Sequence, residues 1–192
     1  MMKARETILG KIRALRLAEV PEPEIPLIET AEADELMFRR ALEAAGAEIV
    51  DIEEAEVSVF LKRAYPKGSI ITAGDLSVEG IKSLSELRNS IESETLTIGV
   101  IHAEFGVSEN GALWISRDCL ANPVFPFIAE HLVVLIKKGN ICSNMHSAYE
   151  KISLRDAPFG LFIAGPSKTA DIEQSLVIGA HGPLSLTVVI TS

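Results

Sequence analysis

Apolar positions at the start of the chain follow a helical period. Their spacing of four and three residues predicts an amphipathic helix over residues 2–17. Three prolines within residues 20–26 then favour an extended, stiff linker. We therefore expect an N-terminal helical arm and linker over residues 1–26, packed against the body or against another subunit. One domain is expected over residues 27–192.

After the linker, helical and extended patterns alternate. Thr30 is a candidate N-cap for a helix that Gly46 would end in the left-handed conformation. A short strand is expected at residues 47–50, a second helix over 53–64, and a strand over 69–72. Helices and strands that alternate at this spacing are typical of an α/β domain.

Further along the chain, short apolar runs predict strands over residues 96–101, 131–136, 159–164 and 184–190. The run 96–101 is suited to a strand buried on both faces, and 131–136 is expected to be another buried strand. Two short strands also flank Asn110 and Gly111, and an Asn-Gly pair in that position is a strong hairpin signal. A helix is expected over residues 143–151. The pattern as a whole predicts one α/β domain with a mixed sheet.

Composition and charge narrow the classes of function. Apolar residues make up 47% of the 192 residues, which excludes disorder as a description of the whole chain. A net charge of −9 argues against sequence-independent nucleic-acid binding and against docking on an anionic membrane. No apolar run approaches the roughly 20 residues that span a bilayer, and the charged N-terminus does not resemble a signal peptide. We expect a cytoplasmic protein.

The two cysteines, Cys119 and Cys142, form no CxxC pair, so the sequence predicts two reduced thiols without a disulfide framework. The same spacing predicts no metal and no iron–sulfur ligand set in this chain. Arg117 would favour the thiolate of Cys119, but a catalytic cysteine needs a partner base, and the sequence indicates none. No HxH or HExxH spacing joins the scattered histidines His102, His131 and His146.

The most informative candidate site is a predicted strand, turn and helix start. The strand would end at Gly165, and a helix would begin near Thr169. Helix N-termini at the carboxyl ends of strands bind anions, so Ser167 and Thr169 are candidates to cap the helix or to bind a carboxylate or phosphate. Asp171 and Glu173 would point about 200° apart on that helix. They are therefore expected to favour the dipole and to face solvent, respectively, and not to form a carboxylate pair.

Two turns carry the other candidates. His181 stands at the tip of a Gly-Pro turn just before the last predicted strand. It is a candidate general acid or base, or a donor to a bound carboxylate, or a residue that only satisfies local carbonyl groups. Glu109 adjoins the Asn-Gly turn, and a buried carboxylate there would be a candidate nucleophile or base.

The segment Gly165-Pro-Ser-Lys-Thr-Ala-Asp-Ile-Glu173 and the following Leu176-Val-Ile-Gly-Ala-His-Gly-Pro183 closely resemble the carboxy-terminal signature of LUD-domain proteins. The nearest branch resembles the lactate-utilisation protein C type. Other segments that are similar to the family are residues 4–13, 103–111 and 131–134.

The resemblance implies a LUD domain over residues 27–192 with a fold like that of the sugar-phosphate isomerases and CoA transferases. That fold is a three-layer α/β/α arrangement around a mixed, mostly parallel sheet. The resemblance also implies a part in oxidising L-lactate to pyruvate. Iron–sulfur clusters would lie only on partner subunits, and this chain would hold no cofactor and bind a small organic acid or other anion. Apart from the resemblance, the acidic surface and the proline-linked helical arm permit a homo-oligomer.

Candidate site residues follow from the resemblance by position. Glu109 and His181 are the catalytic candidates. The ligand-binding candidates are Gly111, Gly165, Ser167, Thr169, Asp171, Glu173 and Gly182.

Departures from the family pattern alter the expected pocket wall. Glu104 replaces an Asp, Asn110 replaces a Thr, and Ile101-His102 replaces the usual small pair. Residues 108–111 are also similar to the catalytic-glutamate motif of class I CoA transferases. Two hypotheses stay open: a substrate-binding subunit of a lactate-oxidising complex, or a stand-alone enzyme that uses Glu109 on an organic acid or an acyl-CoA.

Overall fold

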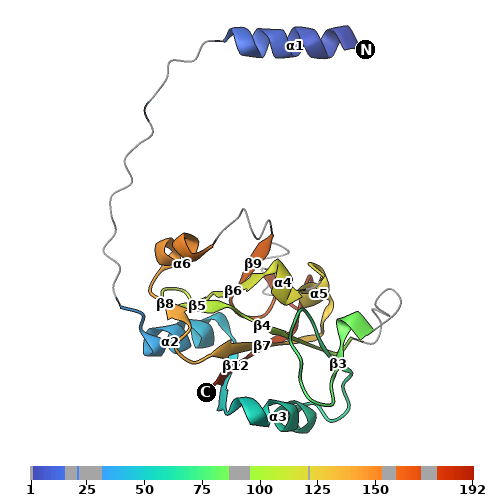
Figure 1. Cartoon of the computed structure of the whole chain (residues 1–192), viewed down its shortest axis with the longest axis vertical. Helices are drawn as coiled ribbons and strands as arrows, with labels where there is room; N and C mark the ends of the chain where they lie inside the picture. The colour runs from blue at the N-terminus through green and yellow to red at the C-terminus, as the bar shows by residue number, and fades with distance from the viewer. Residues whose placement is uncertain are drawn as a thin grey trace.

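A central sheet of six strands organises the protein (Figure 1). The computed structural model describes residues 2–15, 21, 32–86, 96–120, 122–152, 159–169 and 177–192. The strand order is β1-β12-β7-β4-β2-β3, and every neighbouring pair is parallel. The strands are β1 (Glu48–Ile52), β2 (Ile70–Thr72), β3 (Lys82–Ser83), β4 (Ile98–His102), β7 (His131–Lys137) and β12 (Ser185–Thr191). The predicted α/β fold with a mostly parallel sheet is confirmed.

A second sheet of four strands lies against the first, in the order β8-β5-β6-β9. The strands are β5 (Phe105–Val107), β6 (Leu113–Ser116), β8 (Ile141–Cys142) and β9 (Gly160–Ile163). β5 and β6 pair antiparallel around the Asn-Gly turn, as predicted. This second sheet mixes both orientations, because β8 is parallel to β5 while β9 is antiparallel to β6.

The helices are short except at the N-terminal side of the chain. They are α1 (Met2–Ala14), α2 (Glu35–Ala45), α3 (Val57–Ala64), α4 (Arg117–Leu120), α5 (Phe125–Ile128) and α6 (Met145–Lys151). Single 3-10 turns are found at η1 (Glu54–Glu56) and η2 (Leu84–Glu86). α1 confirms the predicted first helix, which ends earlier than expected. The side chains of Ile8 and Ile12 in this helix, and of Leu15 directly after it, are exposed.

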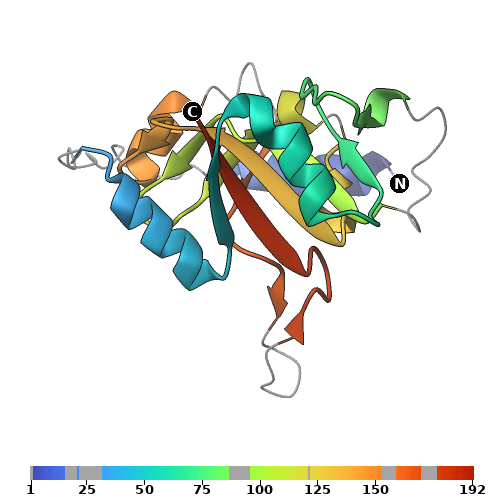
Figure 2. The same ribbon diagram turned by 90° about the horizontal axis from the view of Figure 1, so that it is seen from below.

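The core divides into layers because successive residues of a strand face opposite sides of the sheet. In Figure 2, β7 and β12 run side by side through the middle of the six-stranded sheet. Alternate residues of both strands pack on one face against α2, α5 and the second sheet. The remaining ones pack on the other face against α3. The outer face of the second sheet packs against α6 around Trp114, which fills core as the sequence suggests.

The N-cap of α2 differs from the prediction. Asp34, and not Thr30, caps the helix, since its carboxylate accepts hydrogen bonds from the backbone of Leu36 and Met37. Ser108 fixes Asp34 in turn, because its hydroxyl oxygen accepts a hydrogen bond from the Asp34 backbone at 3.0 Å. The predicted end is confirmed: Gly46 adopts a φ of 88°.

The predicted helix start near Thr169 is wrong. Lys168 and Thr169 form the two-residue strand β10 (Lys168–Thr169), which pairs antiparallel with β11 (Val177–Ile178). Because Thr169 pairs with Val177 in an extended conformation, no helix begins at Thr169. Asp171 and Glu173 lie outside the described residues.

Candidate functional site

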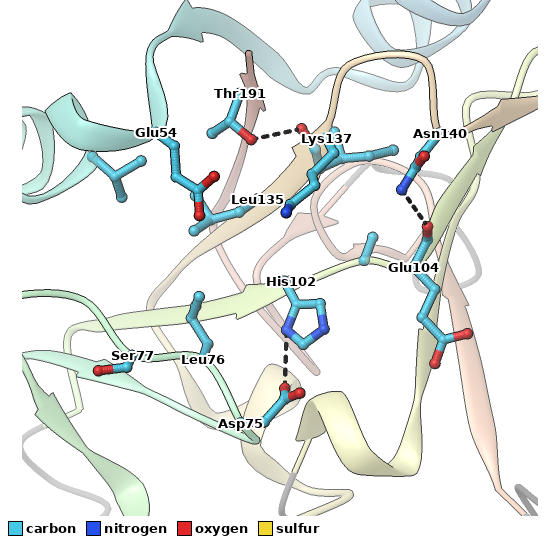
Figure 3. A pocket seen from close by; sticks show the side chains of 13 residues that line it. Glu54, Asp75, Leu76, Ser77, His102, Glu104, Leu135, Lys137, Asn140 and Thr191 are labelled. Carbon is cyan, nitrogen blue, oxygen red and sulfur yellow. Dashed lines mark hydrogen bonds and ion pairs between the residues drawn. The ribbon is translucent and has the colours of Figure 1, made fainter.

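A cavity of about 480 Å³ opens at the carboxyl ends of the central strands (Figure 3). His102, Lys137 and Thr191, which end β4, β7 and β12, line it. Loops that follow β1 and β2 complete the wall with Glu54 and Asp75. Ligands of open α/β sheets bind at this edge, because loops from several parallel strands converge there.

The charged side chains of the cavity wall are mostly acidic. Glu54, Asp75 and Glu104 contribute carboxylates, whereas Lys137 contributes an ammonium group. Figure 3 shows the Lys137 side chain reaching into the cavity between Glu54 and His102. Asn140 is held at the rim, where its side-chain amide donates to the Glu104 backbone oxygen at 3.3 Å.

His102 stands between two partners at the end of β4. Its Nε2 lies 3.2 Å from Cys119 Sγ, and its Nδ1 lies 3.4 Å from Asp75 Oδ1. Nδ1 is buried, and within the described residues it makes no hydrogen bond of good geometry. The three side chains therefore form a row from thiol to imidazole to carboxylate.

Gly74 brings the loop that carries Asp75 close to α4. Its φ is +71°, and a Cβ there would lie 2.5 Å from backbone atoms of Asp118 and Cys119. Only glycine fits this approach, since both the dihedral angle and the space exclude a side chain. The close contact sets the distance between Asp75 and the rest of the row.

Cys119 lies under the cavity wall, with 2% of its surface exposed. Its sulfur is 3.3 Å from the Ser116 hydroxyl and 3.9 Å from Glu104 Oε1. Burial raises the pKa of the Cys119 thiol, and the negative charges of Glu104 and Asp75 raise it further, although the hydrogen bond to Ser116 lowers it. The thiol is therefore protonated at rest near neutral pH.

The sequence indicates no partner for Cys119, whereas the structure places the His102 imidazole beside its sulfur. The two residues are 17 positions apart in the chain, with the β5–β6 hairpin between them. One signal was available: His102 directly follows the buried apolar run of residues 96–101, at the end where α/β sheets bind ligands.

Glu109, a predicted catalytic residue, has a structural contact at the surface. Its side chain is exposed, and Oε2 accepts a hydrogen bond from the Met145 backbone at 3.0 Å. Met145 begins α6, so the carboxylate satisfies a backbone donor at that helix end. Whether Glu109 also acts chemically stays a prediction.

The predicted ligand glycines Gly111 and Gly165 both pack against α2. A Cβ on Gly111 would lie 2.8 Å from the Leu42 nitrogen, and one on Gly165 would lie 2.3 Å from the Ala45 oxygen. Both have positive φ, at +71° and +82°. Lys168 adds a hydrogen bond from Nζ to the same Ala45 oxygen at 2.6 Å. Close packing therefore accounts for glycine at both positions.

Ser167 and Gly182 are brought together. The Ser167 backbone donates to the Pro183 oxygen at 3.0 Å, and a Cβ on Gly182 would lie 3.1 Å from Ser167 Cβ. His181 and Gly182 line a second cavity of about 450 Å³, together with Thr97 and Glu130, which precede β4 and β7. This second cavity therefore lies at the amino ends of the strands.

A family model for the LUD domain matches residues 35–191. The chain belongs to the LUD-domain family. Its match to Lactate utilization protein C of Anoxybacillus flavithermus is 32% identical and covers 73% of this chain and 72% of that protein. Uncharacterized protein YkgG of Escherichia coli is 24% identical, with 70% and 67% covered. Lactate utilization protein C of Oceanobacillus iheyensis is 23% identical, with 53% and 46% covered, so the match spans about half of that relative.

The LUD fold also matches a crystal structure of a duf162 family protein from Deinococcus radiodurans. The TM-score is 0.61 at 15% identity, covering 82% of this chain and 95% of that one. This structural similarity shows a shared fold and nothing more.

Within the LUD domain, the family-like signature and the first cavity occupy different places. The described part of the signature packs against α2 and lines the second cavity, whereas the first cavity lies at the carboxyl ends of the strands. Among the described residues, no cluster of three or more His, Cys, Asp or Glu is arranged to hold a metal ion. None of the described helices combines the length and apolarity needed to cross a membrane.

Proposed function

We propose that this LUD protein is a subunit of a system that oxidises L-lactate to pyruvate and that it binds a small carboxylate in the first cavity. The names of its relatives support the part in lactate utilisation. The observation that carries the site is the exposed Lys137 side chain, whose ammonium group lines a cavity at the carboxyl ends of parallel strands.

A carboxylate ligand would pair with Lys137. The attraction between the two charges is stronger in a partly enclosed cavity than in bulk water, because less solvent screens it. Glu54, Asp75 and Glu104 would repel a second negative charge, but their oxygens accept hydrogen bonds from a hydroxyl group. The cavity therefore favours a monocarboxylate with a hydroxyl or keto group, such as lactate or pyruvate, over a dicarboxylate.

The redox step belongs to partner subunits in this proposal. Oxidation of lactate to pyruvate removes two electrons, which a cofactor must accept. The two cysteines of this chain lie in separate core clusters, so they do not form a shared ligand pair. Iron–sulfur centres on partner subunits would receive the electrons, and this chain would bind and orient the acid.

A screen of ligand classes by thermal shift tests the proposal. At about 100 times its dissociation constant, a ligand that binds only the native state adds about 2.7 kcal/mol of stability. Lactate and pyruvate are expected to raise the midpoint of the wild type and of Ser167→Ala, but not of Lys137→Met. Sugar phosphates and acyl-CoAs are expected to give no shift.

Other outcomes point elsewhere. A shift that survives Lys137→Met and disappears in Ser167→Ala would move the ligand to the signature segment. A shift with an acyl-CoA alone, together with transferase activity that Glu109→Gln abolishes, would replace the proposal with the stand-alone transferase.

A further inference from the structure

The contact between Cys119 and His102 selects one proton arrangement for the row that these two residues form with Asp75. If the thiol donates to Nε2 at 3.2 Å, the other ring nitrogen carries the proton. That nitrogen, Nδ1, lies 3.4 Å from Asp75 Oδ1. A neutral imidazole placed between a thiol and a carboxylate is the arrangement that activates cysteine nucleophiles.

The surroundings fix each member of the row. Ser116 contacts the sulfur, and Gly74 lets the Asp75 loop approach the backbone of Cys119. His102 and Asp75 both line the first cavity, and so does Glu104, which contacts the sulfur as well. An electrophile in the cavity would therefore reach the thiol by displacing the exposed Glu104 side chain, while the His102 ring stays in place.

We propose that Cys119 is a nucleophilic thiol, with His102 as its base, that adds to the carbonyl carbon of a 2-oxo acid held in the first cavity. The sulfur–carbon bond forms as the carbonyl π bond breaks. The thiol proton passes to His102 and then to the new alkoxide oxygen, which gives a thiohemiketal. No electrons are gained or lost, and no atom leaves. The identity of the 2-oxo acid rests on the proposed function, whereas the activation of the thiol does not.

The base is needed because the thiol is protonated at rest. Burial raises the pKa of Cys119, so its sulfur becomes a strong nucleophile only while His102 takes the proton. Asp75 is a positioning residue that keeps the imidazole oriented. It is 75% exposed, so solvent screens its charge and its effect is expected to be smaller than that of His102.

Cys142 is an internal control in the same molecule. It is 4% exposed, and burial raises its pKa as well. Its sulfur contacts the backbone oxygens of Gly106 and Asn144, at 3.3 and 3.7 Å. Both thiols are therefore buried, and they differ in that Cys119 contacts an imidazole.

Alkylation of the full chain by iodoacetamide, followed by peptide mass spectrometry, tests the activation. Cys119 is expected to react at least about tenfold faster than Cys142, since positioned bases contribute about that much or more. His102→Gln should bring Cys119 down to the rate of Cys142, and Asp75→Asn should slow it about two- to fivefold. Equal rates for the two cysteines, or a His102→Gln variant that is folded by circular dichroism and reacts like the wild type, would overturn the activation.

Carbon-13 NMR with [2-13C]pyruvate tests the adduct. The wild type is expected to convert part of the carbonyl signal into a tetrahedral carbon signal that Cys119→Ser lacks. A pair of lysine variants tests where the acid binds: Lys137→Met should weaken the adduct signal, whereas Lys138→Met, which lies outside the first cavity, should leave it unchanged. If labelling depends on His102 but pyruvate neither binds nor forms the tetrahedral signal, the 2-oxo acid and the proposed ligand are overturned, and the activated thiol stands.

Discussion

At the scale of single residues, the site depends on positions that sequence patterns describe poorly. His102, Cys119 and Asp75 each look ordinary in the chain: a histidine after a strand, a cysteine in a polar stretch, an acid after a glycine. Their proximity appears only in the structure, where His102 lies 3.2 Å from the Cys119 sulfur and 3.4 Å from the Asp75 carboxylate. The glycines of the signature were visible in the sequence, but their close contacts with α2 were not.

Gly74→Ala is expected to destabilise the protein more than Gly139→Ala. Both glycines have a positive φ, which costs an alanine about 1–2 kcal/mol. A Cβ at Gly74 would also meet backbone atoms at 2.5 Å, whereas nothing lies within 4 Å of one at Gly139. We expect a loss of about 3 kcal/mol or more for Gly74→Ala and about 1 kcal/mol for Gly139→Ala in urea unfolding. Equal losses would show that the loop does not press on α4.

Stability should fall at alkaline pH because of the buried thiols. Burial raises the pKa of both Cys119 and Cys142 in the folded state. Above the ordinary thiol pKa of about 8.5, the unfolded chain therefore loses protons that the folded chain keeps, and the stability is lost as the pH rises toward the folded pKa values. Urea unfolding between pH 7.5 and about 9.5 should show this decline, and Cys142→Ala should make it shallower. An unchanged slope in Cys142→Ala would contradict this explanation.

At the scale of helices and strands, the sequence predicted most of the central sheet. β4, β7 and β12 were visible because strands buried on both faces are continuous apolar runs. The β5–β6 hairpin followed from its turn. The pairing of β5 with β8 and of β6 with β9 could not be read, because no local pattern specifies partners that are distant in the chain.

The misplaced elements had competing local signals. A Gly-Pro-Ser turn starts a hairpin arm as readily as a helix, so β10 was mistaken for a helix start. In the same way, Thr30 and Asp34 are both good N-cap residues before α2. The contact between Asp34 and Ser108 is a tertiary one that the sequence does not show.

Asp34→Ala is expected to destabilise the protein by about 1 kcal/mol, because two backbone donors of α2 lose their acceptor. Thr30→Ala is the matched change at the position that the sequence favoured, and it is expected to cost less than about 0.5 kcal/mol. Chemical denaturation of both variants checks this. A larger loss for Thr30→Ala would place the functional cap upstream.

At the scale of the whole molecule, the parallel order of the strands gathers the first cavity at one edge of the sheet. Residues that end β4, β7 and β12 meet there, although they come from distant parts of the chain. The predicted residues Ser167, His181 and Gly182 meet near the opposite ends of the strands, around the second cavity. Resemblance to a family therefore predicted the fold, whereas the first cavity could be located only once the strands were assembled into the sheet.

The charges of the first cavity predict its selectivity. Three carboxylates and one ammonium group line its wall, so lactate and pyruvate should bind at least about tenfold more tightly than succinate or malonate, which carry a second negative charge. Competition in a thermal-shift assay at low salt measures the difference. Tighter binding of dicarboxylates would show that the acidic wall does not face the ligand.

Titration calorimetry of pyruvate into the wild type, Lys137→Met and Lys138→Met tests the central claim most directly. The two lysines are neighbours, but only Lys137 lines the first cavity, and Lys138 lines a separate depression beside Asp51. We expect the dissociation constant to rise at least about tenfold in Lys137→Met and to change less than about twofold in Lys138→Met. Equal effects of the two changes, or no effect of either, would contradict a carboxylate site at the carboxyl ends of the central strands.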